Sequence, residues 1–223
     1  MGDNTQAVEG SKKEAMEEDA PFPLTEVDKW VLSQTDEEFH LHDWEELKEI
    51  IANNKLETLK RKPSDLRRYM AWTQATKAQY GSMTSYILQH RLPSSWGKPP
   101  FTTTSLIPFA SPSDYKILLN DWPYGLTDDI THIVVWSKTS IAVDETTGDV
   151  TDESRRVIEE FVRRTFGERV AGEGGGKIED GMERVVWFKN WVSLQSVRAL
   201  EHVHVLVKGA SKEDLEFWTG EGR

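Results

Sequence analysis

Two histidines alternate with valines near the C-terminus, in the stretch EHVHVLV at residues 201–207. In an extended strand, His202 and His204 point to one face of a sheet, while the valines between and after them point to the other. Their side chains then lie about 7 Å apart, close enough to reach one phosphate or one metal ion. Imidazole can serve near neutral pH as base, nucleophile or metal ligand. The competing interpretation is two ordinary half-buried residues with structural hydrogen bonds.

A third imidazole, His132, begins the stretch THIVVWSK, which ends at Lys138. With His202 and His204 it has the composition of a three-histidine zinc site. The other interpretation is that His132 only stabilises the fold.

Amide, carboxylate and hydroxyl groups stand at the ends of neighbouring elements. Asn120 and Asp121 precede Trp-Pro, where such side chains either bind sugar hydroxyls or cap the turn. Asn190 ends another apolar stretch, and Gln195 and Ser196 follow closely. These three can donate hydrogen bonds to phosphate oxygens, or simply cap a short helix.

The hydrophobic pattern indicates how these residues are positioned. Alternating apolar residues predict four strands, with an amphipathic helix between the second and third. We therefore predict an α+β fold with an antiparallel or mixed sheet covered by helices. The expected strands are 115–120, 131–138, 184–189 and 202–208, and the expected helices are 43–54, 64–80, 83–91 and 154–166. Residues 92–114 read as a connector and the glycine-rich stretch 171–181 as a flexible linker.

Composition suggests one folded domain behind a tail. Hydrophobic residues make up 37% of the 223-residue chain, and the first 36 residues are polar and acidic. We expect residues 1–36 to be a disordered tail and 37–223 to be a single α+β domain. Within it, residues 40–92 form a helical N-terminal part and residues 114–208 the sheet core.

Charge and cysteine content exclude several function classes. The net charge of −11 opposes nonspecific binding to nucleic acid, although it leaves room for a local phosphate site. The absence of cysteine removes disulfides and thiol catalysis. No run of eighteen apolar residues and no signal-peptide pattern occur, so we expect no membrane partner and a cytoplasmic or nuclear location.

Four blocks of sequence resemble the fungal N-acetylglucosamine-induced protein family, a domain family of unknown function. They are LETLKRKPSDLRRYMAWTQATKAQYGSMTSYILQHRL, KILLNDWPYGL, HIVVWSK and WFKNWVSLQSVRALEHVHVLV, in the family's order, and the match runs from about residue 40 to 208. The resemblance implies a fungal, amino-sugar-responsive setting and supplies no reaction.

The order ILLNDWPY, THIVVWSK, helix, FKN, QSV and HVHVLV is also similar to the histidine-triad superfamily, including its hexose-phosphate uridylyltransferase branch. That resemblance implies that His204 attacks an α-phosphate, while His202 orients it or takes part in proton transfer. The positions it matches to substrate binding are Asn120, Asp121, His132, Lys138, Asn190, Gln195 and Ser196.

The chain departs from the histidine-triad pattern at three residues. Leu206 replaces the third histidine, Thr131 the glycine before His132, and Ser137 the proline before Lys138. Because leucine cannot donate a hydrogen bond to phosphate, these departures are compatible with weakened or lost catalysis and retained binding.

Four hypotheses follow. The first is a phosphohydrolase or nucleotidyltransferase of nucleotides or nucleotide sugars, with His204 as nucleophile and Lys189 or Arg198 adding to the phosphate contacts. The second is a non-catalytic nucleotide-sugar binder or sensor, and the third a metal-dependent enzyme using the three histidines. The fourth is a structural protein with no site there. We expect no cofactor, and exposed aromatic residues permit a homodimer.

Overall fold

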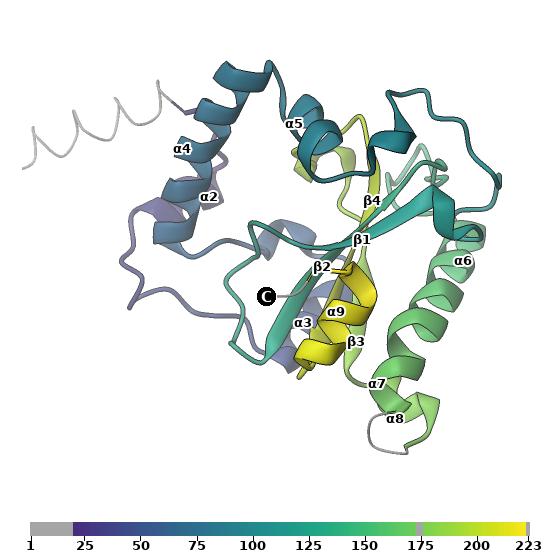
Figure 1. Ribbon diagram of the computed structural model, residues 1–223. Coiled ribbons are helices and arrows are strands. Elements are labelled where there is room, and N and C mark those ends of the chain that lie inside the picture. The colour runs from purple at the N-terminus through teal and green to yellow at the C-terminus, as the bar shows by residue number, and fades with distance from the viewer. Residues whose placement is uncertain (1–19, 173–175, 222–223) are drawn as a thin grey trace, which may run out of the picture.

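The computed structural model describes residues 20–172 and 176–221, and its centre is one antiparallel sheet. The strand order is β1-β2-β4-β3, so the C-terminal strand lies inside the sheet. The strands are β1 (Tyr115–Leu119), β2 (Ile130–Ser137), β3 (Val185–Phe188) and β4 (Glu201–Lys208). The α+β architecture expected from the sequence is confirmed (Figure 1).

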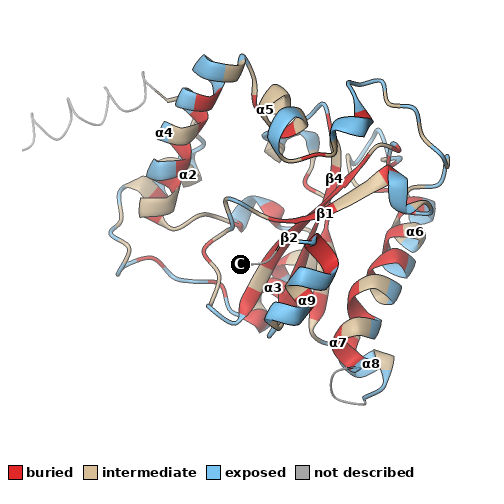
Figure 2. Cartoon of the chain, in the orientation of Figure 1, coloured by how far each residue is buried: buried red, intermediate tan, exposed pale blue. Residues whose placement is uncertain are grey.

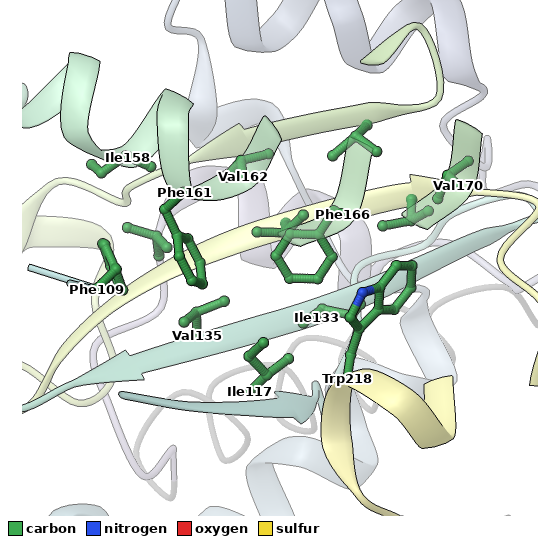
Figure 3. Close-up of a cluster of buried hydrophobic side chains, with 14 of the residues drawn as sticks. Phe109, Ile117, Ile133, Val135, Ile158, Phe161, Val162, Phe166, Val170 and Trp218 are labelled. Atoms are coloured by element: carbon green, nitrogen blue, oxygen red, sulfur yellow. The ribbon is translucent and has the colours of Figure 1, made fainter. Parts of the chain in front are cut away.

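One face of the sheet carries the main apolar core. The alternation of β4 sends its three valines to this face, where they are fully buried. Figure 3 shows Phe161 and Phe166 packed over Val135 and Ile133 of β2. The covering elements are α6 (Asp152–Val162), a π-helical turn (Arg163–Gly167), α7 (Glu168–Gly172) and α9 (Lys212–Thr219).

The opposite face of the sheet carries the histidines, and helices pack against it at its two ends. Helix α5 (Met83–His90) packs Met83 and Ile87 against Trp136 at one end. Helix α3 (Trp44–Ala52) packs Leu47 against Leu206 at the other end. The polar middle of this face therefore lies between two apolar clusters.

The N-terminal part folds against α4 (Pro63–Tyr80) rather than forming a tail up to residue 36. Helix α2 (Glu26–Leu32) buries Val31 against Leu66 and Tyr69 of α4. Asp36 accepts hydrogen bonds from Ser64 N (2.8 Å) and Ser64 Oγ (2.6 Å) at the start of α4. Helix α4 begins at Pro63 after Lys62, so Ser64 lies in its first turn. Residues 1–19 of the expected tail lie outside the described ranges.

The expected linker 171–181 also contains regular structure. Helix α8 (Ile178–Met182) packs beside α7, and the backbone of Gly181 lies against the carbonyl of Gly167. Short 3-10 turns complete the chain at Leu56–Thr58, Ser94–Trp96, Pro112–Asp114 and Val192–Leu194. Among the described residues, no helix is both long and apolar enough to cross a bilayer. The inner faces of α4, α6 and α7 are the buried ones (Figure 2).

Candidate functional site

A cavity of about 630 Å³ opens on the histidine face of the sheet. Its walls come from the ends of β1 and β4, from α4 and α5, from the segment after β3, and from residues 22–28. Seven residues singled out from sequence line it: Asn120, Asp121, Asn190, Gln195, Ser196, His202 and His204. Elements far apart in the sequence therefore bring most of the predicted polar residues together.

His204 lies in a buried chain of hydrogen bonds. Asn190 Nδ2 donates to His204 Nε2 (3.2 Å), which leaves the proton of His204 on Nδ1. His204 Nδ1 then donates to His132 Nε2 (2.9 Å). Asn120 Nδ2 donates to the same His132 nitrogen (3.1 Å), and its Oδ1 accepts from Trp122 N (2.9 Å). Both nitrogens of His204 are thus occupied by protein partners.

His202 is held differently. Its Nδ1 donates to the carbonyl oxygen of Leu200 (2.8 Å), so Nε2 carries the lone pair. Across the described residues, no protein group bonds to that Nε2. The ring lies 4.6 Å from the ring of Trp136 and borders the cavity. The nitrogen available to a ligand therefore belongs to His202, not to His204 as the sequence resemblance implied.

Burial keeps all three imidazoles neutral. Loss of solvation lowers the pKa of His132 to about 3 and that of His202 to about 4. For His204, burial and then the neighbouring His132 and His202 hold the pKa well below its usual value. Neutral rings offer lone pairs at pH 7, which suits a nucleophile or acceptor rather than a cationic phosphate anchor.

Three of the residues predicted from sequence do not line the cavity: His132, Lys138 and Lys189, whose Nζ pairs with Glu201 (3.4 Å). His132 does not line the cavity itself and contacts its lining through His204 and Asn120. Lys138 is turned away: its Nζ pairs with the buried carboxylate of Asp114 (2.7 Å) and donates to Thr102 O (3.0 Å). A carboxylate buried in the connector needs a counter-charge, and this accounts for the place of Lys138.

The three-histidine metal site is not formed. His132 and His204 hydrogen-bond directly to each other, so they do not present a common metal position. Within residues 20–172 and 176–221, no group of three or more His, Asp or Glu side chains has a geometry that could hold a metal.

Sequence reasoning missed most of the positive charge in the cavity. Five basic residues line it against two acidic ones, Asp28 and Asp121. The basic residues are Lys60, Arg61, Lys77, Arg91 and Arg198, of which only Arg198 was considered from sequence. The signal for Arg61 was the run KRKP, which looks like the solvated start of a helix.

These cations differ in their availability to a ligand. Arg91 pairs with Asp121 (3.0 Å) and Glu221 (3.1 Å), and Lys77 donates to Pro21 O (2.6 Å). Arg61 lies 4.0 Å above the ring of Tyr69. Among the described residues, neither Lys60 nor Arg198 has an ion-pair or hydrogen-bond partner for its side chain. These two are therefore the cations best placed to bind an anion.

Aromatic rings and unpartnered polar atoms complete the lining. Trp72 contacts both Tyr69 (6.1 Å between ring centroids) and Trp122 (5.2 Å). Thr73 Oγ1 and Asn190 Oδ1 are buried in the same lining, and neither has a hydrogen-bond partner in the part of the chain that the structure describes. Since buried polar atoms are normally satisfied, these two are candidates for contact with a bound ligand.

Fold and site together define an α+β protein in which hydrogen-bonded, buried histidines lie beneath a cavity lined by basic and aromatic residues. The chain belongs to the family described as protein of unknown function (DUF3605), whose model matches residues 43–208.

Named relatives are similar along most of their length. N-acetylglucosamine-induced protein 1 of Candida albicans is 31% identical over 183 residues, which is 74% of this chain and 67% of that protein. The uncharacterized protein YPL067C of Saccharomyces cerevisiae is 29% identical over 177 residues, 79% of this chain and 84% of that protein. The crystal structure of HTC1 superposes with a TM-score of 0.60 at 26% identity, covering 78% of this chain and 91% of that one.

Proposed function

We propose that the cavity binds a phosphorylated small molecule with a planar ring, of the nucleotide or nucleotide-sugar class. The observation that carries this proposal is the gathering of five basic residues in one cavity of a chain whose net charge is −11. Basic side chains facing each other repel, so a bound anion would relieve their repulsion. A cavity of about 630 Å³ also falls in the size range of small-molecule sites.

The lining supplies a separate group for each part of such a ligand. Lys60 and Arg198 would meet the phosphate charge, and the aromatic surface around Trp72 and Trp122 would stack on a ring. Thr73 and Asn190 would take hydrogen bonds that no protein group makes. The side-chain nitrogen and oxygen of Asn120 both already make hydrogen bonds within the protein. Asn120 would therefore orient His132 rather than bind ribose.

Direct binding measurements test the proposal. We expect nucleoside mono- and diphosphates or nucleotide sugars to raise the melting temperature and to bind measurably by calorimetry. The double variant Lys60→Gln/Arg198→Gln should weaken binding at least tenfold, an effect that grows at low salt. The control is Lys98→Gln, an exposed lysine outside the cavity lining. Absence of binding, or equal losses in both variants, would refute the proposal.

Turnover by a strand histidine is the second candidate function, because Nε2 of His202 has no partner among the described residues and the residue lines the cavity. That lone pair would attack phosphorus and form an N–P bond while the P–O bond to the leaving group breaks. The leaving oxygen takes a proton from solvent, and water then cleaves the N–P bond to restore the imidazole. The name of the Candida relative, which refers to N-acetylglucosamine, makes nucleotide amino sugars natural probes.

A further inference from the structure

The N-terminal segment forms one wall of the cavity. Phe22, Pro23, Thr25 and Asp28 all contribute to the lining, although they precede the family match, which begins at residue 43. The shape and charge of this side of the cavity therefore come from a part of the chain outside the matched region.

This wall is firmly attached to α4. Lys77 Nζ donates to Pro21 O (2.6 Å), and Arg67 Nη2 donates to Leu32 O (2.7 Å). The ring of Phe22 lies 5.8 Å from that of Tyr69, and Val31 is fully buried in the cluster beneath. Because burial of an apolar side chain stabilises the folded state, the segment is an integral part of the folded site.

Asp28 places a negative charge in a cavity whose lining holds five basic residues and one other acid. Its carboxylate accepts hydrogen bonds from Thr25 N (2.9 Å) and Thr25 Oγ1 (2.7 Å) in the capping box of α2. Asp121, the other acid in the lining, is paired with Arg91. Asp28 also acts electrostatically on Lys60: burial lowers the pKa of that lysine, and the charge of Asp28 opposes the change.

A carboxylate at this position discriminates between ligands. It accepts hydrogen bonds from hydroxyl or amino hydrogens, and it repels a phosphate brought close to it. The nearby aromatic surface of Tyr69 and Trp72 offers an apolar face on which the C–H groups of a sugar ring can pack.

We propose that Asp28 is a specificity-determining residue: it accepts hydrogen bonds from the neutral, polyhydroxylated end of the ligand and excludes an additional terminal phosphate. The inference rests on the proposed function and narrows it from nucleotides in general to nucleotide sugars.

Matched ligand pairs test this assignment. UDP-glucose is compared with UTP, and ADP-glucose with ATP, by calorimetry on the full chain. We expect the wild type to prefer the sugar of each pair and Asp28→Asn to lose at least tenfold of that preference, equivalent to about 1.4 kcal/mol. The control Glu26→Gln removes a charge from the same helix at a side chain that is 90% exposed, and it should keep the preference.

Each outcome separates the two proposals. If the wild type binds none of the four ligands, the proposed function fails. If it binds them and Asp28→Asn leaves the ratio unchanged, only the role of Asp28 fails. Asp28→Glu also alters the helix cap but keeps the charge, so it should retain discrimination against the triphosphates; loss of discrimination there would contradict a charge-based role.

Discussion

The three buried histidines of the site differ in how their ring nitrogens are hydrogen-bonded, although they have common surroundings. His132 and His204 are hydrogen-bonded to each other, and hydrogen bonds from Asn120 and Asn190 fix the orientation of their rings. His202 is locked on one nitrogen only. Since all lie on one sheet face, the difference arises from which backbone and amide groups surround each ring.

If the protein turns over a nucleotide sugar, the reactive ring should be His202. We expect His202→Asn to lower kcat at least a hundredfold, the size of effect usual for loss of a histidine that acts in the chemical step. Its ligand affinity should stay within about threefold of wild type, because the neutral ring provides no charge to the phosphate. Rapid-quench assays for the nucleoside phosphate and sugar phosphate products, together with calorimetry, check both numbers.

His204→Asn serves as the comparison for that experiment. It should reduce the melting temperature, because it breaks the buried hydrogen-bond chain to His132. If His204→Asn folds normally but is inactive, while His202→Asn is active, then His204 and not His202 has the chemical role.

Residue types and spacing predicted the polar half of the site but not its charged half. The strand alternation was enough to place His202 and His204 on one face, because a strand has a period of two. The cations were missed because Lys60 and Arg61 precede a helix, where basic residues are ordinarily solvated. Nor could sequence show that Asp114, 24 positions before Lys138, would take that lysine as its partner.

Elements were predicted well where one hydrophobic period dominates. The four strands and α6 follow from local alternation or amphipathic spacing. Helices α2 and α8 were not predicted, since seven and five residues are too few to establish a period. Both are stabilised by tertiary contacts, α2 against Tyr69 and α8 against the turn at Gly167.

The packing of α8 leaves no room for a side chain at Gly181. A Cβ at this position would overlap the carbonyl oxygen of Gly167 and lie 2.9 Å from the Cβ of Ala171. We expect Gly181→Ala to lower the free energy of unfolding by about 1–3 kcal/mol, as overpacking does elsewhere. Urea denaturation measures the change.

Gly172→Ala is a matched control for Gly181→Ala. A Cβ at Gly172 would meet nothing within 4 Å. Because alanine also favours helix over glycine, this variant should be neutral or slightly stabilising. Equal destabilisation by the two substitutions would mean that α8 does not pack as described.

At the scale of the whole molecule, the two sheet faces differ in what they bury. The valine face buries the large apolar core against α6, α7 and α9. The other face buries the polar histidine centre between apolar clusters formed with α3 and α5. Burying titratable rings on that second face links the stability of the entire chain to pH.

The unfolding free energy should fall as the pH drops below the ordinary histidine pKa of 6.5. Between pH 6.5 and about 4, the unfolded chain binds protons at His132 and His202 that the folded chain does not, because burial lowers their folded-state pKa values to about 3 and about 4. Stability therefore rises with pH in this window, by up to about 1.4 kcal/mol per pH unit for each histidine.

Urea titrations at half-unit steps from pH 4.5 to 7 measure this slope. His202→Asn should reduce it by about one proton. The slope is the informative quantity, since it isolates protonation from any packing defect in the variant. A slope that His202→Asn does not alter would show that this imidazole is solvated in the folded protein, in conflict with its place beneath the cavity.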